Sequence, residues 1–226
     1  MDRPVLPVKK VKFLAELPLA ESEELIRRSE KRTYPNGSLV FSQGEKMPGV
    51  FVVSKGMFKV YRSIGKEKIQ VLDVIKPGQC IGEVQVFSNG IAMTNAEARG
   101  NAESWIIPAT DLHKAVLRNP IVAEVMLRHL AGKLVHLIPL VETLSLHRVP
   151  ERVAQLILAQ LKDAPNKTLV EFRETQEELA QYVGSSREAL NRALRLLCDL
   201  GFIQSTFPVV HVLDRQKLLC FSKGLK

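Results

Sequence analysis

Residues 175–200, with the sequence TQEELAQYVGSSREALNRALRLLCDL, predict two short helices joined by a sharp turn. Thr175 stands three residues before Glu178, which is the spacing of a capping box at the start of a helix. Gly184 follows the first helix and can take the left-handed backbone conformation that a tight turn needs. This arrangement is typical of a helix-turn-helix motif, whose second helix lies in the major groove of DNA.

The second helix of this motif is predicted to be capped by Ser185, three residues before Glu188. One side of it is apolar and would face a core: Ala189, Leu190, Ala193, Leu194 and Leu197. The other side is polar: Arg187, Glu188, Asn191, Arg192 and Arg195. Arginine can donate two hydrogen bonds to guanine O6 and N7, and glutamate can accept one from cytosine N4. We therefore favour DNA binding over the alternative, an amphipathic surface helix whose charges are merely solvated.

Composition sets the broad class of the protein. The 226 residues are enough for one large or two small domains, and 46% of them are hydrophobic. No apolar run has the length of a membrane span and the N-terminus lacks a signal-peptide core, so we expect a cytoplasmic protein with no membrane partner. The formal net charge of +8 suits a polyanionic partner. From Arg148 onward, however, there are twelve Lys and Arg and nine Asp and Glu, an excess of only three positive charges. The arginines on one side of the second helix are therefore the stronger indication of DNA binding.

The three cysteines, Cys80, Cys198 and Cys220, show no C-x-x-C spacing. A metal or iron–sulfur site built only from cysteines is therefore not expected. Reduced cytosolic thiols are the simplest interpretation.

A short helix is expected around Glu21 to Glu30, and residues 31–109 then show a β pattern. Short β-branched and aromatic runs alternate there with glycine-containing turns, among them Lys55-Gly56. The expected strands are Ser38–Ser42, Val50–Ser54, Met57–Ser63, Lys68–Val74 and Ser104–Ile107. Many short strands predict a sandwich or small barrel, whose interior is a common place for a small ligand.

From about Asp111 the apolar period becomes helical and forms a seam with alternating spacings of four and three. Its members are Ala123, Leu127, Leu130, Leu134, Leu137, Val141 and Leu144. Three heptads of such a seam favour a parallel homodimer over a helix packed on its own β domain. Pro139 falls off the seam and should bend the helix locally. A symmetric dimer would present two reading helices about 34 Å apart and call for a palindromic site.

The C-terminal part is predicted to follow a break at residues 148–151. A helix over Glu151–Leu161, a turn over 163–166 and a strand over Leu169–Phe172 precede the helix-turn-helix. Strands Phe202–Ser205 and Val209–Leu213 then form a hairpin around residues 206–208. Helices followed by a hairpin indicate a winged helix-turn-helix.

In this order of elements, the chain resembles the cyclic-AMP receptor protein and fumarate-nitrate regulator (CRP/FNR) superfamily. The resemblance covers nearly the whole chain and rests on Tyr34-Pro35-x-Gly37, Gln43-Gly44-Glu45-Lys46, Lys55-Gly56, Pro77-Gly78-x-x-Ile81-Gly82-Glu83 and Val183-Gly184-x-Ser186-Arg187-Glu188-x-x-x-Arg192. It implies an α+β fold. The expected parts are an N-terminal double-stranded β-helix (β-roll) that senses an effector (1–110), a dimerisation helix (111–147) and a winged helix-turn-helix (148–226).

The resemblance also assigns residues to DNA. Arg187, Glu188 and Arg192 match the base readers of the cyclic-AMP receptor type, which implies half-sites like TGTGA. The positions that contact the phosphate backbone in the family are Thr175, Gln176 and Ser186. Asn191 replaces the serine of the fumarate-nitrate regulator pattern, which favours the first specificity. The partners implied are palindromic double-stranded DNA, a second copy of the chain and RNA polymerase.

The sensor departs from the family pattern. Cyclic-AMP binders carry an arginine ten residues after the acid that corresponds to Glu83, where this chain has Met93, followed by Thr94. A buried phosphate charge without a partner is costly. The family's polar adenine-contacting pair falls at two apolar residues, Leu137 and Ile138. We therefore predict that cyclic AMP is not a tight effector. The predicted effector pocket consists of Ile81, Gly82, Glu83, Met93, Thr94, Leu137 and Ile138.

Several effectors remain open. The apolar pocket residues suggest a small apolar or aromatic molecule, or haem. His129 and His136 are seven residues apart on one helix face and are either haem ligands or ordinary surface and packing histidines. Other residues that can ligate iron are Met57, Met93 and Cys80. A regulator without any effector, controlled by its abundance, is a further alternative.

Two other classes of function compete with a transcription factor. A ligand-binding module could act through protein contacts alone. An enzyme is disfavoured because no Ser-His-Asp order, metal spacing or phosphate loop stands out. The acids Glu83, Glu97 and Glu103 are interpreted as ordinary surface charge rather than as an acid–base pair.

Overall fold

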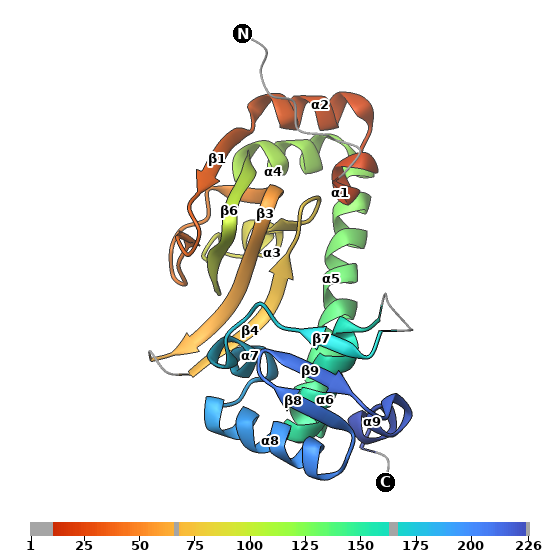
Figure 1. Ribbon diagram of the computed structural model, residues 1–226. Coiled ribbons are helices and arrows are strands. Elements are labelled where there is room, and N and C mark those ends of the chain that lie inside the picture. The colour runs from red at the N-terminus through yellow and green to blue at the C-terminus, as the bar shows by residue number, and fades with distance from the viewer. Residues whose placement is uncertain (1–10, 66–67, 163–166, 225–226) are drawn as a thin grey trace. The chain divides into compact units, whose positions relative to one another are not determined.

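The computed structural model describes residues 11–65, 68–162 and 167–224 (Figure 1). The chain divides into two compact units. One contains the described parts of residues 1–62 and 72–136, and the other those of 63–71 and 137–226. The turn predicted at 163–166 lies outside the described residues. Within the described ranges, none of the helices combines the length and the apolar character needed to cross a membrane.

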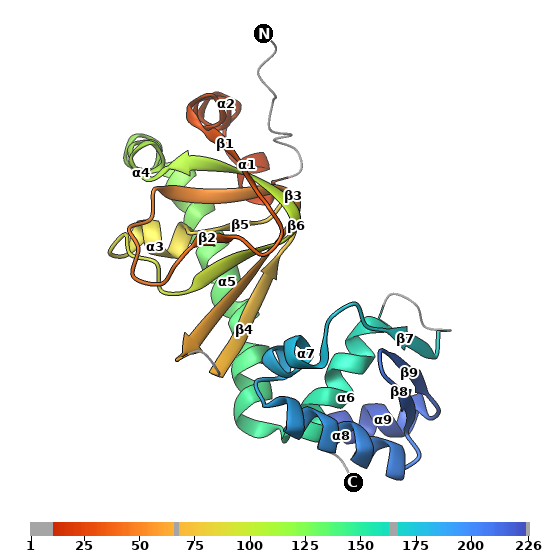
Figure 2. The ribbon, with the colours of Figure 1, turned by 60° about the vertical axis from the view of Figure 1, so that its left-hand side comes forward.

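The first unit is built on a β-roll, as predicted. Its main strand order is β1-β6-β3-β4, with β2 paired to β6 and β5 paired to β3. Figure 2 shows these strands curving around a common interior. The bounds are β1 (Glu30–Tyr34), β2 (Leu39–Phe41), β3 (Gly49–Ile64), β4 (Lys68–Ile75), β5 (Cys80–Ile81) and β6 (Asn95–Pro108).

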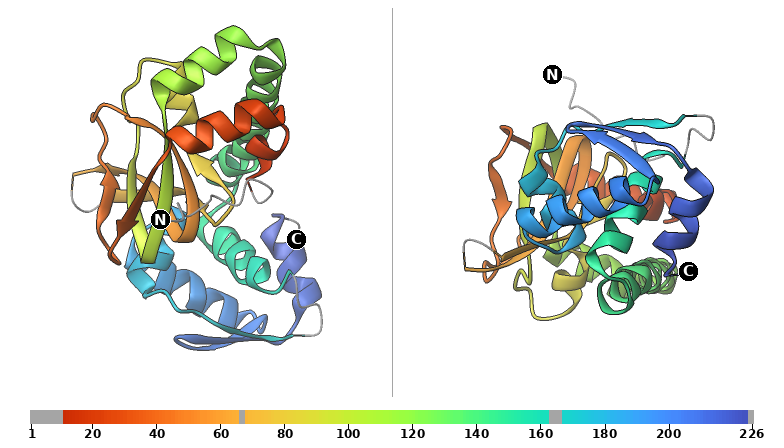
Figure 3. Two further views of the ribbon diagram at one scale, coloured as in Figure 1. Left: turned by 90° about the horizontal axis from the view of Figure 1, so that it is seen from above. Right: turned by 60° about the horizontal axis from the view of Figure 1, so that its bottom comes forward.

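The helices that accompany this sheet in the described residues are α1 (Lys12–Ala15), α2 (Leu19–Arg28), α3 (Glu83–Phe87), α4 (Ala109–Arg118) and the first part of α5 (Pro120–Leu146). Helices α2 and α4 contact each other and β6 (Figure 3, left). The helix expected from Glu21 to Glu30 begins two residues earlier and ends at Arg28, because Glu30 already opens β1.

The start of β3 faces two cores at once. Because successive side chains of a strand point to opposite faces, Val50 and Val52 pack with the helices. Phe51 and Val53 enter the interior of the roll. All four are buried, which explains why this run of sequence is continuously apolar rather than alternating.

The turn predicted at Lys55-Gly56 is wrong, because β3 is a single strand from Gly49 to Ile64. Gly56 has φ +67° and lies at shifts of register between β3 and β6. A Cβ at this position would lie 2.7 Å from Ala102 Cα. The glycine therefore forms a β-bulge that lets the two backbones approach closely.

The single helix expected over 111–147 is also wrong, since α4 ends at Arg118 and α5 begins at Pro120. Proline lacks the N–H that a continuous helix would need and disfavours a helical residue before it. Asn119 instead caps the new helix, because its Oδ1 accepts a hydrogen bond from Ile121 N at 3.0 Å. Pro139 lies inside α5, as expected.

The second unit contains the end of α5 and a winged helix-turn-helix. Its elements are α6 (Val149–Gln160), β7 (Leu169–Glu171), α7 (Gln176–Val183), α8 (Arg187–Asp199), β8 (Ile203–Thr206), β9 (Val209–Val212) and α9 (Arg215–Ser222). The strands form an antiparallel sheet in the order β7-β9-β8. This blue and cyan unit is seen from another side in Figure 3 (right). One core joins its helices and strands, including Ile157, Leu179, Leu190, Leu197 and Val210.

Gly56→Ala should destabilise the β-roll more than a matched substitution in an open turn. Gly65 also has a positive φ, +64°, but nothing lies within 4 Å of a Cβ built there. Gly65→Ala should therefore lower the free energy of unfolding by only about 1–2 kcal/mol, which is the cost of a side chain in the left-handed conformation. Gly56→Ala adds the clash with Ala102. Urea unfolding of both variants measures the difference, and equal losses would contradict the bulge interpretation.

Candidate functional site

The turn between α7 and α8 is set by local hydrogen bonds and one glycine. Thr175 and Glu178 form the predicted capping box: Glu178 N donates to Thr175 Oγ1 at 3.2 Å, and Thr175 N donates to Glu178 Oε2 at 2.8 Å. Gly184 takes the left-handed conformation, with φ +62°. The cap predicted at Ser185 is wrong. The N-cap is Ser186, whose Oγ accepts from Ala189 N at 3.2 Å, so α8 starts one residue later than expected.

Helix α8 is amphipathic in the sense that the sequence predicted. Its buried residues are Leu190, Ala193, Leu194 and Leu197. Arg187, Glu188 and Arg192 are exposed on the other side. The pKa of Glu188 is lowered, first by a hydrogen bond from its own backbone N–H and then by the Ser186 hydroxyl. Glu188 is therefore an ionised acceptor beside two arginines at neutral pH.

Gln176 connects the two helices of the motif. Its Oε1 accepts hydrogen bonds from Arg187 Nε at 3.3 Å and from Asn191 Nδ2 at 3.2 Å. The family resemblance implied that Gln176, together with Thr175 and Ser186, contacts the DNA backbone. In the unbound chain all three side chains stabilise the motif itself. Thr175 and Ser186 cap its helices, and Gln176 accepts a hydrogen bond from Arg187.

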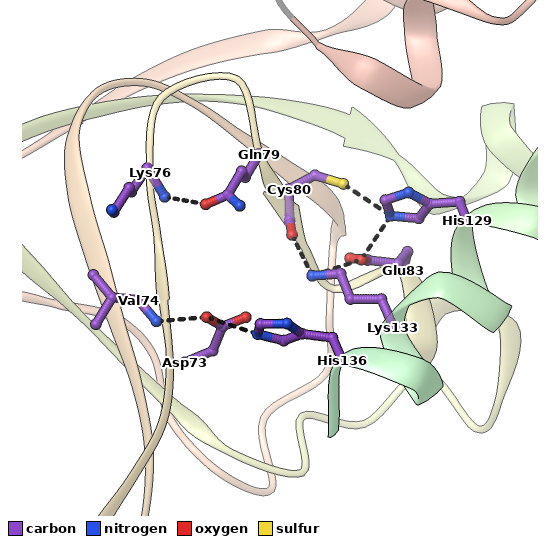
Figure 4. A network of polar contacts seen from close by, with 9 residues as sticks. All are labelled: Asp73, Val74, Lys76, Gln79, Cys80, Glu83, His129, Lys133 and His136. Atoms are coloured by element: carbon purple, nitrogen blue, oxygen red, sulfur yellow. Dashed lines mark hydrogen bonds and ion pairs between the residues drawn. The ribbon is translucent and has the colours of Figure 1, made fainter. Parts of the chain in front are cut away.

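A second group of polar side chains lies in the first unit, with Cys80 and Glu83 buried and His129 and Lys133 partly exposed (Figure 4). Glu83, the first residue of α3, is 1% exposed, which corrects its interpretation as surface charge. Its Oε1 lies 3.0 Å from His129 Nε2 and 3.2 Å from Lys133 Nζ, both on α5. Cys80 on β5 completes the group: its Sγ lies 3.4 Å from His129 Nε2, and its carbonyl accepts from Lys133 Nζ at 3.1 Å.

Within this group, Glu83 and Lys133 are charged and the Cys80 thiol is neutral, for electrostatic reasons. Burial alone would raise the pKa of Glu83, but the His129 hydrogen bond and the Lys133 charge outweigh it and lower that pKa. Burial, followed by the Glu83 charge, raises the pKa of Cys80 well above its usual range. Among the described residues, no hydrogen-bond partner reaches Glu83 Oε2.

The residues predicted to form the effector pocket differ in their surroundings. Ile81 is buried, whereas Met93 is 44% exposed. Thr94 Oγ1 is buried and has no hydrogen-bond partner within the described ranges. Gly82 has φ +105°, and a Cβ there would lie 2.9 Å from the Gly49 carbonyl oxygen. Leu137 and Ile138 belong to the part of α5 in the second unit and are exposed.

One cation that the sequence did not single out lies beside the predicted pocket. Arg62 Nη1 donates to the Met93 carbonyl at 3.0 Å, and Arg62 is exposed. Its position depends on the pairing of β3 with β6, which brings Tyr61 opposite Asn95 and which the spacing of residues in the sequence does not reveal.

The two histidines proposed as haem ligands have separate partners. His129 Nε2 faces Glu83 and Cys80, and His136 Nε2 lies 3.9 Å from Asp73 Oδ1. Both line a cavity of ≈ 370 Å³, together with Phe13, Asp73, Gln79, Gly132 and Lys133. Met57, another suggested iron ligand, is 39% exposed on β3.

Lys133 is the member of the buried group that sequence reasoning missed. Its spacing of four from His129 places both on one face of α5, and Cys80 and Glu83 are three residues apart. These two spacings were the available signals. Only the packing of α5 against β5 and α3 brings the two pairs together.

Comparisons with known proteins agree with this architecture. Residues 31–119 match the cyclic nucleotide-binding domain family, and residues 151–221 match the Crp-like helix-turn-helix domain family. The chain is 26% identical over 198 residues to the CRP-like cAMP-activated global transcriptional regulator of Mycobacterium tuberculosis, covering 86% of this chain and 88% of the relative. It is also 26% identical to the cyclic AMP receptor protein of Thermus thermophilus over 196 residues, 87% and 89% of the two chains.

A solved structure shares the fold at lower sequence identity. It is a regulator assigned to the CRP/FNR family from Eubacterium rectale, with 18% identity and a TM-score of 0.78 over 95% of this chain and 99% of that one. The β-roll, the long helix and the winged helix-turn-helix, together with both family matches, lead to one conclusion. The chain belongs to the CRP/FNR superfamily of DNA-binding transcription regulators.

Proposed function

We propose that the chain acts as a homodimer and reads a palindromic, TGTGA-like DNA site through α8. The observation that carries this proposal is the exposed face of α8, on which Arg187, Glu188 and Arg192 stand opposite the buried leucines. Arginine and ionised glutamate are base-reading groups, and Gln176 holds Arg187 in place before DNA arrives. RNA polymerase is a further expected partner of such a regulator.

The homodimer is supported by the face that α5 leaves uncovered. Helix α5 buries Val122, Val125 and Met126 in its own unit. The predicted seam lies elsewhere on the helix: Leu127 and Leu134 are each 68% exposed, and Val141 is 61% exposed in the single chain. A row of exposed leucines at heptad spacing is the pattern of a partner helix. Of the other seam residues, Leu137 is 42% exposed, whereas Ala123, Leu130 and Leu144 are half-buried.

We also propose that cyclic AMP does not control this protein, although the relatives are named for it. Met93 supplies no charge for a phosphate. Glu83 already has internal partners, because the Lys133 ammonium group forms an ion pair with it and His129 Nε2 lies 3.0 Å from the same oxygen. These contacts also support the second candidate, a regulator of the same type that needs no organic effector. A small apolar molecule or haem remains a prediction.

Arg187→Ala should weaken binding to a palindromic TGTGA-type duplex by about 1–3 kcal/mol and relax base choice at the matching position. The loss follows from removing a two-bond contact to guanine. Fluorescence anisotropy with matched and base-substituted duplexes measures both effects at one salt concentration. Lys217→Ala, which removes an exposed charge from α9, is the control and should keep base choice unchanged. Intact specificity in Arg187→Ala would refute the base-reading role.

Leu134→Glu should convert the dimer into a monomer, because two carboxylates would meet in the middle of an apolar seam. Light scattering coupled to size-exclusion chromatography gives the mass directly. Leu146→Glu is the matched control, since Leu146 is 74% exposed on α5 but lies off the seam. A Leu134→Glu protein that remains dimeric would place the dimer interface elsewhere.

Calorimetric titration with micromolar cyclic AMP should give no saturable heat. The physical reason is that no arginine stands at position 93 and that Lys133 competes for Glu83. A parallel titration of the Thermus thermophilus relative serves as the positive control. Micromolar binding would contradict the proposal, and Arg62→Ala would then test whether Arg62 holds the phosphate.

A further inference from the structure

The buried group in the first unit contains three side chains of the kinds that bind transition metals. Cys80 Sγ, a Glu83 carboxylate oxygen and His129 Nε2 all lie within 4.8 Å of one another (Figure 4). We propose that they form a site for one divalent transition-metal ion of the Zn²⁺ or Co²⁺ class. A mixed sulfur, nitrogen and oxygen set suits these ions, whereas Ca²⁺ and Mg²⁺ prefer oxygen alone.

Two of the three distances between donor atoms suit such an ion, and the third is within 4.8 Å. Bonds of about 2.0–2.3 Å in a tetrahedral arrangement separate ligand atoms by roughly 3.3–3.6 Å. His129 Nε2 lies 3.4 Å from Cys80 Sγ and 3.0 Å from Glu83 Oε1. Small side-chain shifts are therefore enough to place an ion between the three donor atoms.

A second, independent observation concerns the other oxygen of Glu83. Oε2 is buried, and no hydrogen-bond partner for it exists among the residues that the structure describes. Buried carboxylate oxygens nearly always have a partner. An ion bound to this carboxylate would supply the missing partner.

Lys133 is the internal cation that a metal ion must displace from Glu83 Oε1. Its side chain is 26% exposed and borders the cavity of ≈ 370 Å³, so its ammonium group can swing away on a flexible stem. His129 and Gly132 border the same cavity. The cavity provides a path for the ion and room for water at a fourth coordination position.

Coordination needs no oxidant or further reactant. The Cys80 thiol loses its proton to solvent as the metal–sulfur bond forms, because the thiolate is the ligand. His129 binds through the lone pair of Nε2 and keeps its proton on Nδ1. The resulting ion links β5 and α3 to α5. This site does not depend on DNA binding, so it can be tested separately.

The test is a Co²⁺ titration of the full chain after chelator treatment, under reducing conditions. We expect one Co²⁺ per chain, with a thiolate-to-cobalt charge-transfer band that Zn²⁺ abolishes. Cys80→Ser should lose this band, and His129→Gln should weaken affinity by more than about tenfold. His136→Gln and Cys220→Ser, which lie outside the three-residue set, should behave like the unmodified protein. Lys133→Met removes the competing cation and should bind Co²⁺ at least as tightly.

Several results would overturn the site. They are no charge-transfer band in the unmodified chain, a band that survives Cys80→Ser, a band lost in Cys220→Ser, or weaker binding in Lys133→Met. Circular dichroism and thermal melting verify that each variant is folded. Should Cys80→Ser not fold, the partly exposed His129 decides, and an unchanged affinity in His129→Gln would reject the proposal.

Discussion

The ionised carboxylate of Glu83 lies in the interior of the first unit, at 1% exposure. An unpaired charge at such a place costs several kcal/mol, so the unit can form only with cations next to it. Lys133 supplies this positive charge, and His129 adds a polar contact, from a helix whose Val122, Val125 and Met126 pack in the same unit. The pairing therefore fixes which face of α5 turns inward, and the leucine row at Leu127 and Leu134 is left outward.

The reading helix obeys a similar constraint. Leu190, Ala193, Leu194 and Leu197 must be buried in the small core of the second unit, and this fixes the rotation of α8 about its own axis. Arg187, Glu188 and Arg192 then have to face solvent. Hydrogen bonds within the motif add order, since Gln176 holds Arg187 and the Ser186 hydroxyl caps the helix. The burial of the apolar face of α8 thus decides which direction its charged face points.

Errors in the sequence interpretation have identifiable physical causes. Lys55-Gly56 has the composition of a turn, but pairing with β6 continues past it and converts the glycine into a bulge. Asn119-Pro120 divides the predicted long helix. The sequence interpretation missed this break because the apolar period continues through it. The cap at Ser186 rather than Ser185 is a shift of one residue between two equivalent caps.

Local sequence determined most of the fold of this protein. The capping box at Thr175 and the left-handed Gly184 depend on residues a few positions apart, so spacing was sufficient to predict them. The group of Cys80, Glu83, His129 and Lys133 was decided only by tertiary structure. Its two halves lie more than forty residues apart, and no local pattern specifies that a strand end and a helix face will share one buried charge.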